Sequence, residues 1–225
     1  MASMVEPVDT PQGPGRLFVD LAEQPSSLLV LGHGAGGGVG AADLELLATS
    51  LPALATTVVR FEQPWRTAGR TVGPPPPKLD DAWRAALGWL MEQEWAAQHP
   101  LLVGGRSAGA RVACRTASDT NPAAIVCLAF PLHLPGRPEK SRAAELLAPT
   151  APRLVLQGSK DSFGTPAEIR AAIGTAEGVN VVELPGADHS YRIAKSSAFT
   201  PADLRSTLVA EVSGFIGAVA GISTQ

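Results

Sequence analysis

Cysteine, net charge and long apolar runs are all scarce in this chain of 225 residues, and each shortage argues against a class of protein. The two cysteines, Cys114 and Cys127, have no partners at zinc-binding spacing, so we predict no metal site. A net charge of −3 offers no basic footprint for nucleic acid. The longest apolar runs, such as residues 123–130, are too short to span a bilayer.

The N-terminal residues also lack the charged and apolar segments of a secretory signal peptide. We therefore expect a cytoplasmic protein with no membrane or nucleic-acid partner. A hydrophobic content of 45% with 17% charged residues is typical of a globular chain. We predict a flexible N-terminus over residues 1–15 and one domain over residues 16–220.

Short β-type runs alternate with helical segments along the whole chain. The expected strands are residues 16–20, 27–31, 56–61, 100–103, 123–130, 153–157 and 180–184. The expected helices are residues 41–50, 79–98, 108–118, 166–176 and 201–219. Several strands are almost entirely apolar, as in a parallel sheet that is covered on both faces. The alternation predicts a doubly wound α/β domain with a mostly parallel sheet.

A serine stands between two glycines where one of these strands turns into a helix. The pattern G-x-S-x-G spans Gly105, Ser107 and Gly109. Such a turn strains the serine and projects its hydroxyl at the edge of the sheet, where it can act as a nucleophile. In a chain this rich in glycine, about 0.15 matches to G-x-S-x-G are expected by chance. A serine that only caps the helix would give the same pattern. The residues around the serine must therefore decide between these interpretations.

A serine nucleophile needs a positioned base, which a carboxylate orients. The pattern resembles the turn of the α/β-hydrolases, and in those proteins the partners follow the serine in the order acid, then histidine. The four histidines are His33, His99, His133 and His189. His189 lies just after the expected strand 180–184, where the base belongs, so we predict that it is the base. His133 is kept as a reserve base or substrate contact.

The carboxylate should lie between Ser107 and His189, on a loop that follows a strand. Asp161 meets this condition, because residues 153–157 are an expected strand and the chain then turns. Asp188 directly precedes His189, and from that position its carboxylate reaches the histidine ring less easily. Glu183 is a weaker candidate still, because it lies within an expected strand. We predict that Asp161 orients the base, although aspartate is also common in turns for structural reasons.

A glycine-rich loop, residues 32–38, follows the expected strand 27–31 and precedes a helix. Its backbone amides could converge on a negatively charged oxygen. We predict an oxyanion hole made by the amide of Ala108 together with that of Gly34 or Ala35. The loop matches neither common nucleotide-binding pattern, which argues against a phosphate ligand.

Three further residues are candidate substrate contacts: Arg106, His133 and Trp65. Arg106 precedes the serine and could hold a carboxylate, or could tie the turn to a nearby acidic residue. Trp65 belongs to the proline-rich segment 62–78, which is expected to wall the site. The other candidate wall, residues 131–152, is short, so we predict no lid domain and a shallow, accessible site.

Five motifs together resemble the Tex/KANL-type α/β-hydrolases, relatives of the dienelactone hydrolases. They are residues 32–36 (GHGAG), 104–111 (GGRSAGAR), 130–133 (FPLH), 157–161 (QGSKD) and 188–190 (DHS). The resemblance extends from about residue 27 to residue 215 and implies an α/β-hydrolase fold with Ser107, Asp161 and His189 as the catalytic triad. The family often has glycine where this chain has Ala110.

The expected function is that of a carboxylesterase-like serine hydrolase, which acts on a small-molecule acyl or ester substrate through an acyl-enzyme and needs no metal or organic cofactor. Two alternatives remain open at this stage. Some eukaryotic relatives in the family act within chromatin-associated assemblies, so the chain could be a binding or scaffold protein. The acyl acceptor could also be a group other than water, as in an acyltransferase, or the substrate could be a thioester.

Overall fold

A computed structural model describes residues 4–221 and contains one eight-stranded sheet in the order β1-β2-β4-β3-β5-β6-β7-β8. The strands are β1 Met4–Thr10, β2 Gly13–Asp20, β3 Ser27–Gly32, β4 Thr56–Glu62, β5 Leu101–Arg106, β6 Ala124–Leu128, β7 Arg153–Gly158 and β8 Val179–Leu184. Strands β3 to β8 pair in parallel, and β1 and β2 form an antiparallel edge. This is the α/β-hydrolase fold class that the sequence predicts.

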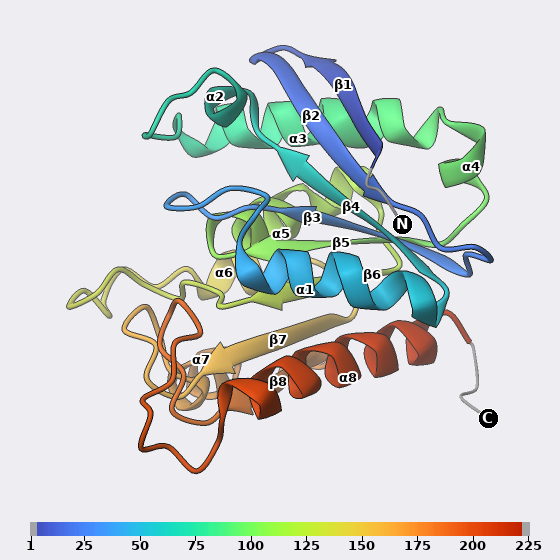
Figure 1. Ribbon diagram of the computed structural model, residues 1–225. Helices are drawn as coiled ribbons and strands as arrows, with labels where there is room; N and C mark the ends of the chain where they lie inside the picture. The colour runs from blue at the N-terminus through green and yellow to red at the C-terminus, as the bar shows by residue number, and fades with distance from the viewer. Residues whose placement is uncertain (1–3, 222–225) are drawn as a thin grey trace.

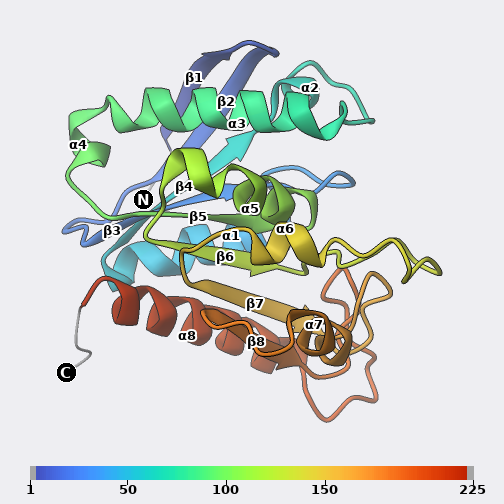
Figure 2. The ribbon, with the colours of Figure 1, turned by 180° about the vertical axis from the view of Figure 1, so that it is seen from behind.

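Helices cover both faces of the sheet, as the apolar strands require. They are α1 Ala42–Ser50, the 3-10 turn η1 Leu51–Leu54, α2 Pro64–Thr67, α3 Pro76–Met91, α4 Glu94–Ala97, α5 Ala108–Thr120, α6 Ala143–Leu147, α7 Pro166–Ile173 and α8 Pro201–Val219. Helices α1 and α8 pack on one face, and α3, α5, α6 and α7 on the other (Figures 1 and 2). The carboxyl ends of the parallel strands meet at one edge, where functional loops gather in folds of this type.

The prediction of a flexible N-terminus over residues 1–15 is wrong for residues 4–15, which belong to a β-hairpin. Residues 1–3 lie outside the described part, but residues 4–10 and 13–20 form a paired hairpin, with Met4 opposite Val19. The turn is closed by Thr10, whose hydroxyl donates to the Gly13 carbonyl at 2.7 Å. Pro7 interrupts the alternating pattern of β1, which an edge strand tolerates. That proline is why the sequence pattern does not reveal the strand.

The segment 79–98, predicted as one helix, contains two helices, α3 and α4. Helix α3 begins earlier than expected, at Pro76, because proline is well suited to the first turn of a helix. It ends after Met91, where Gln93 takes an extended conformation and its side chain donates to the Trp89 carbonyl at 2.9 Å. That hydrogen bond satisfies a carbonyl at the helix end, and α4 starts anew at Glu94.

Two glycines let β3, β5 and α5 approach very closely. A Cβ at Gly109 would lie 2.2 Å from the Gly32 carbonyl oxygen, and one at Gly105 would lie 2.4 Å from the same atom. A methyl group at either position would force the start of α5 away from the sheet.

We expect Gly109→Ala to lower the free energy of unfolding by about 2–4 kcal/mol, because the clash is with backbone. Gly88→Ala is the matched control, since Gly88 lies within α3 and a Cβ there meets no atom within 4 Å. The control should raise stability by about 0.5–1 kcal/mol. Urea denaturation of both variants measures the difference, and equal stabilities would contradict the packing described for Gly109.

Candidate active site

Ser107 occupies the sharp turn between β5 and α5. Its backbone has φ 51° and ψ −107°, a conformation that costs energy for any residue with a Cβ. The turn is held by the Ser107 amide, which donates to the Leu128 carbonyl at 2.9 Å, and by the first turn of α5. Strain of this kind persists where the surrounding structure imposes it, and here it projects the hydroxyl beyond the strand ends.

The serine hydroxyl contacts His189, which in turn contacts Asp161. The distance from Ser107 Oγ to His189 Nε2 is 3.0 Å, and from His189 Nδ1 to Asp161 Oδ2 it is 2.8 Å. Because the carboxylate can only accept, Nδ1 carries the proton and Nε2 is left to accept from the serine. The three side chains predicted from the sequence therefore meet at one point, from the ends of β5, β7 and β8.

Asp161 is held in place by more than the histidine. It is 2% exposed, and Oδ2 also accepts from Gln157 Nε2 at 2.9 Å. Its other oxygen, Oδ1, accepts from the Phe163 amide at 2.8 Å. A buried carboxylate with three donors has a fixed orientation, so it fixes the histidine ring as well.

Phe163 is a component of the site that sequence reasoning missed. Its ring stacks on the His189 ring, with the centroids 4.1 Å apart and the planes inclined by 30°. The aromatic face shields one side of the imidazole and restricts its rotation. Only its position, two residues after Asp161, could have drawn attention to it.

The predicted oxyanion residues lie beside the nucleophile. A Cβ built on Gly34 would be 3.6 Å from Ser107 Cβ, which places this loop against the turn. Ala35 and Ala108 both line the cavity that adjoins the serine, whereas Gly34 does not. No hydrogen bond within residues 4–221 uses the amide of Ala35 or Ala108. The Gly34 amide is likewise unused among these hydrogen bonds, and Ala35 is the alternative that lines the cavity.

His33 orders the glycine-rich loop as a neutral side chain. Its Nε2 accepts from the Gln63 amide at 3.1 Å, so the proton is on Nδ1, which donates to the Gly34 carbonyl at 2.9 Å. Burial lowers the pKa of His33 below its ordinary value, in agreement with this arrangement. The loop therefore presents no histidine charge to the site.

Arg106 ties the turn of Ser107 to a nearby acidic residue, which is the second of its two predicted roles, and it is not among the residues that line the cavity beside that turn. Its guanidinium donates to the His189 carbonyl and, at 3.3 Å, to Asp43, and lies over the Tyr191 ring at 5.2 Å. Arg106 directly precedes Ser107, so it joins the backbone at Ser107 to the backbone at His189. Burial raises the pKa of Asp43, and the Arg106 charge opposes that shift. The arginine thus connects the turn of Ser107 with the loop that carries His189.

We expect Arg106→Met to lower kcat about tenfold with little change in KM, because the loop of His189 loses its hydrogen bond to the residue before Ser107. Asp43→Asn should retain most of kcat, since the bond from Arg106 to the His189 carbonyl remains. Arg84→Met, at an exposed arginine on α3, is the control. Steady-state kinetics measures these effects, and a rise in KM alone would instead indicate that Arg106 binds substrate.

His133 is neither a second base nor one of the residues that line the cavity beside the turn of Ser107. It is buried, and its Nδ1 is 2.9 Å from the Leu134 carbonyl oxygen. Its Nε2 lies 3.5 Å from Glu168 without the geometry of a hydrogen bond. The His133 amide donates to the Phe163 carbonyl at 3.0 Å. The residue therefore supports the loop of Asp161 and Phe163, and its prediction as a substrate contact is corrected.

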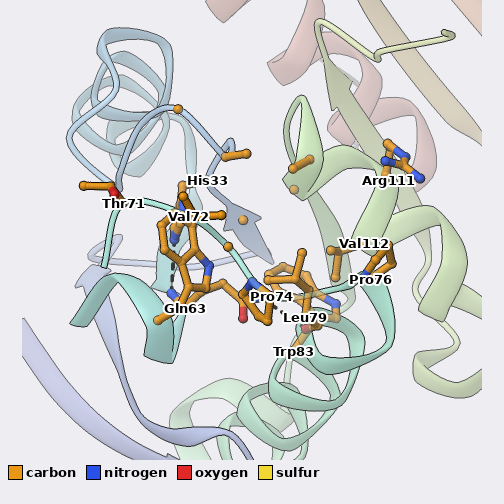
Figure 3. A pocket seen from close by; sticks show the side chains of 17 residues that line it. His33, Gln63, Thr71, Val72, Pro74, Pro76, Leu79, Trp83, Arg111 and Val112 are labelled. Carbon is orange, nitrogen blue, oxygen red and sulfur yellow. Dashed lines mark hydrogen bonds between the residues drawn. The ribbon is translucent and has the colours of Figure 1, made fainter. Parts of the chain in front are cut away.

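A cavity of about 500 Å³ adjoins the turn of Ser107 (Figure 3). Trp65 lines it, as predicted, together with Leu79 and Trp83 of α3 and the proline-rich loop that joins α2 to α3. The predicted shallowness of the site stays a prediction. The loop 68–75 and α3 supply most of this wall, and the other candidate wall, residues 131–152, contains only the short helix α6 and no lid domain.

Other chemistry is not evident in the described part of the chain. Residues 4–221 contain no group of three or more potential metal ligands. Cys114 and Cys127 are free and buried, with their sulfurs 3.7 Å apart, and the neighbouring thiol together with burial raises the pKa of Cys127. None of the helices described is both long enough and apolar enough to cross a membrane.

Comparison with known proteins shows the family and the fold of this chain. A family described as "Alpha/beta hydrolase domain" matches residues 25–217. XC6422 of Xanthomonas campestris, described as a serine hydrolase without a lid, has 26% identity and a TM-score of 0.73 over 96% of this chain and 95% of its own. A serine hydrolase homologue from Coxiella burnetii has 22% identity and a TM-score of 0.73, over 94% and 98%. Est1E of Butyrivibrio proteoclasticus has 13% identity and a TM-score of 0.76, over 98% and 100%. No curated protein matched.

Proposed function

This chain belongs to the alpha/beta hydrolase domain family, and on that premise we propose that it is a carboxylesterase-like serine hydrolase with Ser107, His189 and Asp161 as its triad. The observation that carries the proposal is the continuous contact from Ser107 Oγ through the imidazole to the buried carboxylate. The descriptions of XC6422 as a serine hydrolase and of the Coxiella protein as a serine hydrolase homologue support it. The narrower relationship to Tex/KANL-type hydrolases is part of the proposal and rests on the motifs given above.

The proposed reaction begins when His189 Nε2 takes the proton of Ser107 as Oγ attacks the carbonyl carbon of an ester. Asp161 keeps the imidazole in the tautomer that accepts this proton and stabilises its charged form. The amides of Ala108 and Ala35 donate to the oxyanion that develops. These donors are fixed by the backbone, so they need no reorganisation when the charge appears.

The tetrahedral intermediate collapses when His189 gives its proton to the departing alcohol, which leaves an acyl-serine ester. A water molecule, deprotonated by the same imidazole, then attacks that ester and releases the acid. Every proton step uses His189, so the stacking of Phe163 on its ring and the tie from Arg106 to its carbonyl both serve the reaction.

Hydrolysis of oxygen esters and of thioesters with the same acyl group tests the proposal against its alternatives. We expect turnover of p-nitrophenyl acetate and butyrate, with release of the free acid. Formation of a new ester when an alcohol is added, with little free acid, would instead identify an acyltransferase. No turnover of either substrate class by folded protein would favour the scaffold interpretation.

A further inference from the structure

The cavity lies on one side of the turn of Ser107, and its lining starts at Ala108, the residue after Ser107, which is not itself among the lining residues. The cavity is lined by Ala35, Gly36, Ala108 and Gly109, which flank the predicted oxyanion hole, and by Leu79 and Trp83 of α3. Within the described residues, no wall of the cavity comes from the loops after β7 or β8, which carry Asp161 and His189. The cavity is therefore on the side of the serine away from the base.

This asymmetry decides which half of an ester the cavity can hold. The departing oxygen must lie near His189 Nε2, because that atom returns the proton. The alcohol part then extends past His189, away from the cavity. The acyl chain leaves the carbonyl carbon on the side opposite the departing oxygen, so it is directed past the amides of Ala108 and Ala35, which stand at the wall of the cavity, and into the cavity.

The walls of the cavity are mostly apolar, with His33, Gln63, Thr71 and Arg111 as the polar side chains among the lining residues, and they carry no unpaired charge. Figure 3 shows Leu79, Trp83 and Pro74 gathered together, with His33 and Gln63 at one end and Arg111 at the other. His33 is neutral in its hydrogen-bonded state, as shown above. Arg111, the one cation among the described lining residues, is paired with both oxygens of Glu145, at 2.6 and 2.7 Å. An acyl group with its own carboxylate would have to compete with Glu145.

From this geometry, and resting on the proposed function, we infer that the cavity is the acyl-binding site for an uncharged apolar acyl group. A volume of about 500 Å³ is in the range that holds ligands of drug size, so chains of up to about eight carbons fit. Each methylene that is buried there adds about fourfold to binding. Selectivity should therefore follow the acyl chain, while the alcohol part is recognised weakly.

Two ester series separate the two halves of the substrate. One varies the acyl chain from acetate to octanoate with p-nitrophenol as the leaving group, and the other varies the alcohol of an acetate. We expect kcat/KM to rise about tenfold or more along the first series and to change less than about threefold along the second. A p-nitrophenyl hemisuccinate should be at least about tenfold poorer than the butyrate.

A cavity-filling variant links this selectivity to the site. Leu79→Trp adds bulk at a half-buried position of the wall and should lower kcat/KM for octanoate about tenfold, with acetate changed less than about twofold. The control is Leu54→Trp, at an exposed leucine of η1 that does not line the cavity. The control should leave the whole acyl series unchanged.

The outcomes distinguish the inference from the function on which it rests. If acetate is hydrolysed but rates follow the alcohol and not the acyl chain, the acyl-site inference is overturned and the proposed function stands. Equal losses on acetate and octanoate in Leu79→Trp would also overturn the inference. Absence of hydrolysis throughout, with no fluorophosphonate labelling of Ser107, would overturn the proposed function and the inference together.

Discussion

Ser107→Ala is expected to lower kcat for p-nitrophenyl butyrate by at least about a thousandfold, with the fold retained. The variant loses the atom that attacks the carbonyl, and the oxyanion donors alone leave only a residual acceleration over water. The backbone turn is held by the amide of residue 107 and the Leu128 carbonyl, which alanine does not remove. Stopped assays under saturating substrate, together with urea denaturation, measure both properties.

Ser118→Ala is the matched control for that result. Ser118 lies on the same helix, α5, and its hydroxyl contacts only the neighbouring Asp119 among the described residues. Its kcat should equal that of the unaltered protein. Unchanged activity in Ser107→Ala would show that another group performs the reaction and would contradict the assignment of the nucleophile.

Asp161→Asn is expected to lower kcat by about 10³- to 10⁴-fold while leaving the site assembled. The amide cannot accept from all three donors that surround the carboxylate: Gln157, Phe163 and His189. In either orientation its NH₂ group faces another N–H donor, and the negative charge that stabilises the imidazolium is lost. Kinetics over a range of pH measures the effect on the base.

Asp188→Asn discriminates between the two carboxylates near the base. Asp188 Oδ1 accepts from the amides of Ser190 and Arg192, at 2.7 and 2.9 Å, and an asparagine oxygen can replace it. We expect less than about a threefold change in kcat for this variant. A larger loss in Asp188→Asn than in Asp161→Asn would transfer the orienting role to Asp188.

Much of the fold follows from local patterns in the sequence. The apolar strands of the parallel sheet and helix α8 were predicted with small shifts at their ends, and the range 201–219 agrees with the structure at both ends. Thr200 begins α8 with a capping box to Asp203, a signal that is readable in the sequence. Strand β1 was missed because its apolar pattern is weak and contains Pro7.

The residues of the predicted triad were found because each lies directly after a strand, and the carboxyl ends of parallel strands share one edge. The roles of Arg106 and Phe163 could not be predicted in the same way. Both depend on contacts with His189, which is 83 and 26 residues away in the chain. The wall of the cavity likewise depends on how the loop 68–75 packs against Trp65, which no local pattern specifies.

The most direct test of the central claim is mass-spectrometric mapping of the adduct formed with a fluorophosphonate, which modifies only an activated serine. We predict one adduct, on the peptide that contains Ser107, formed rapidly by the unaltered protein and at least about a hundredfold more slowly by His189→Ala. Ser107→Ala should form none. An adduct on another serine, or none on folded protein, would contradict the account.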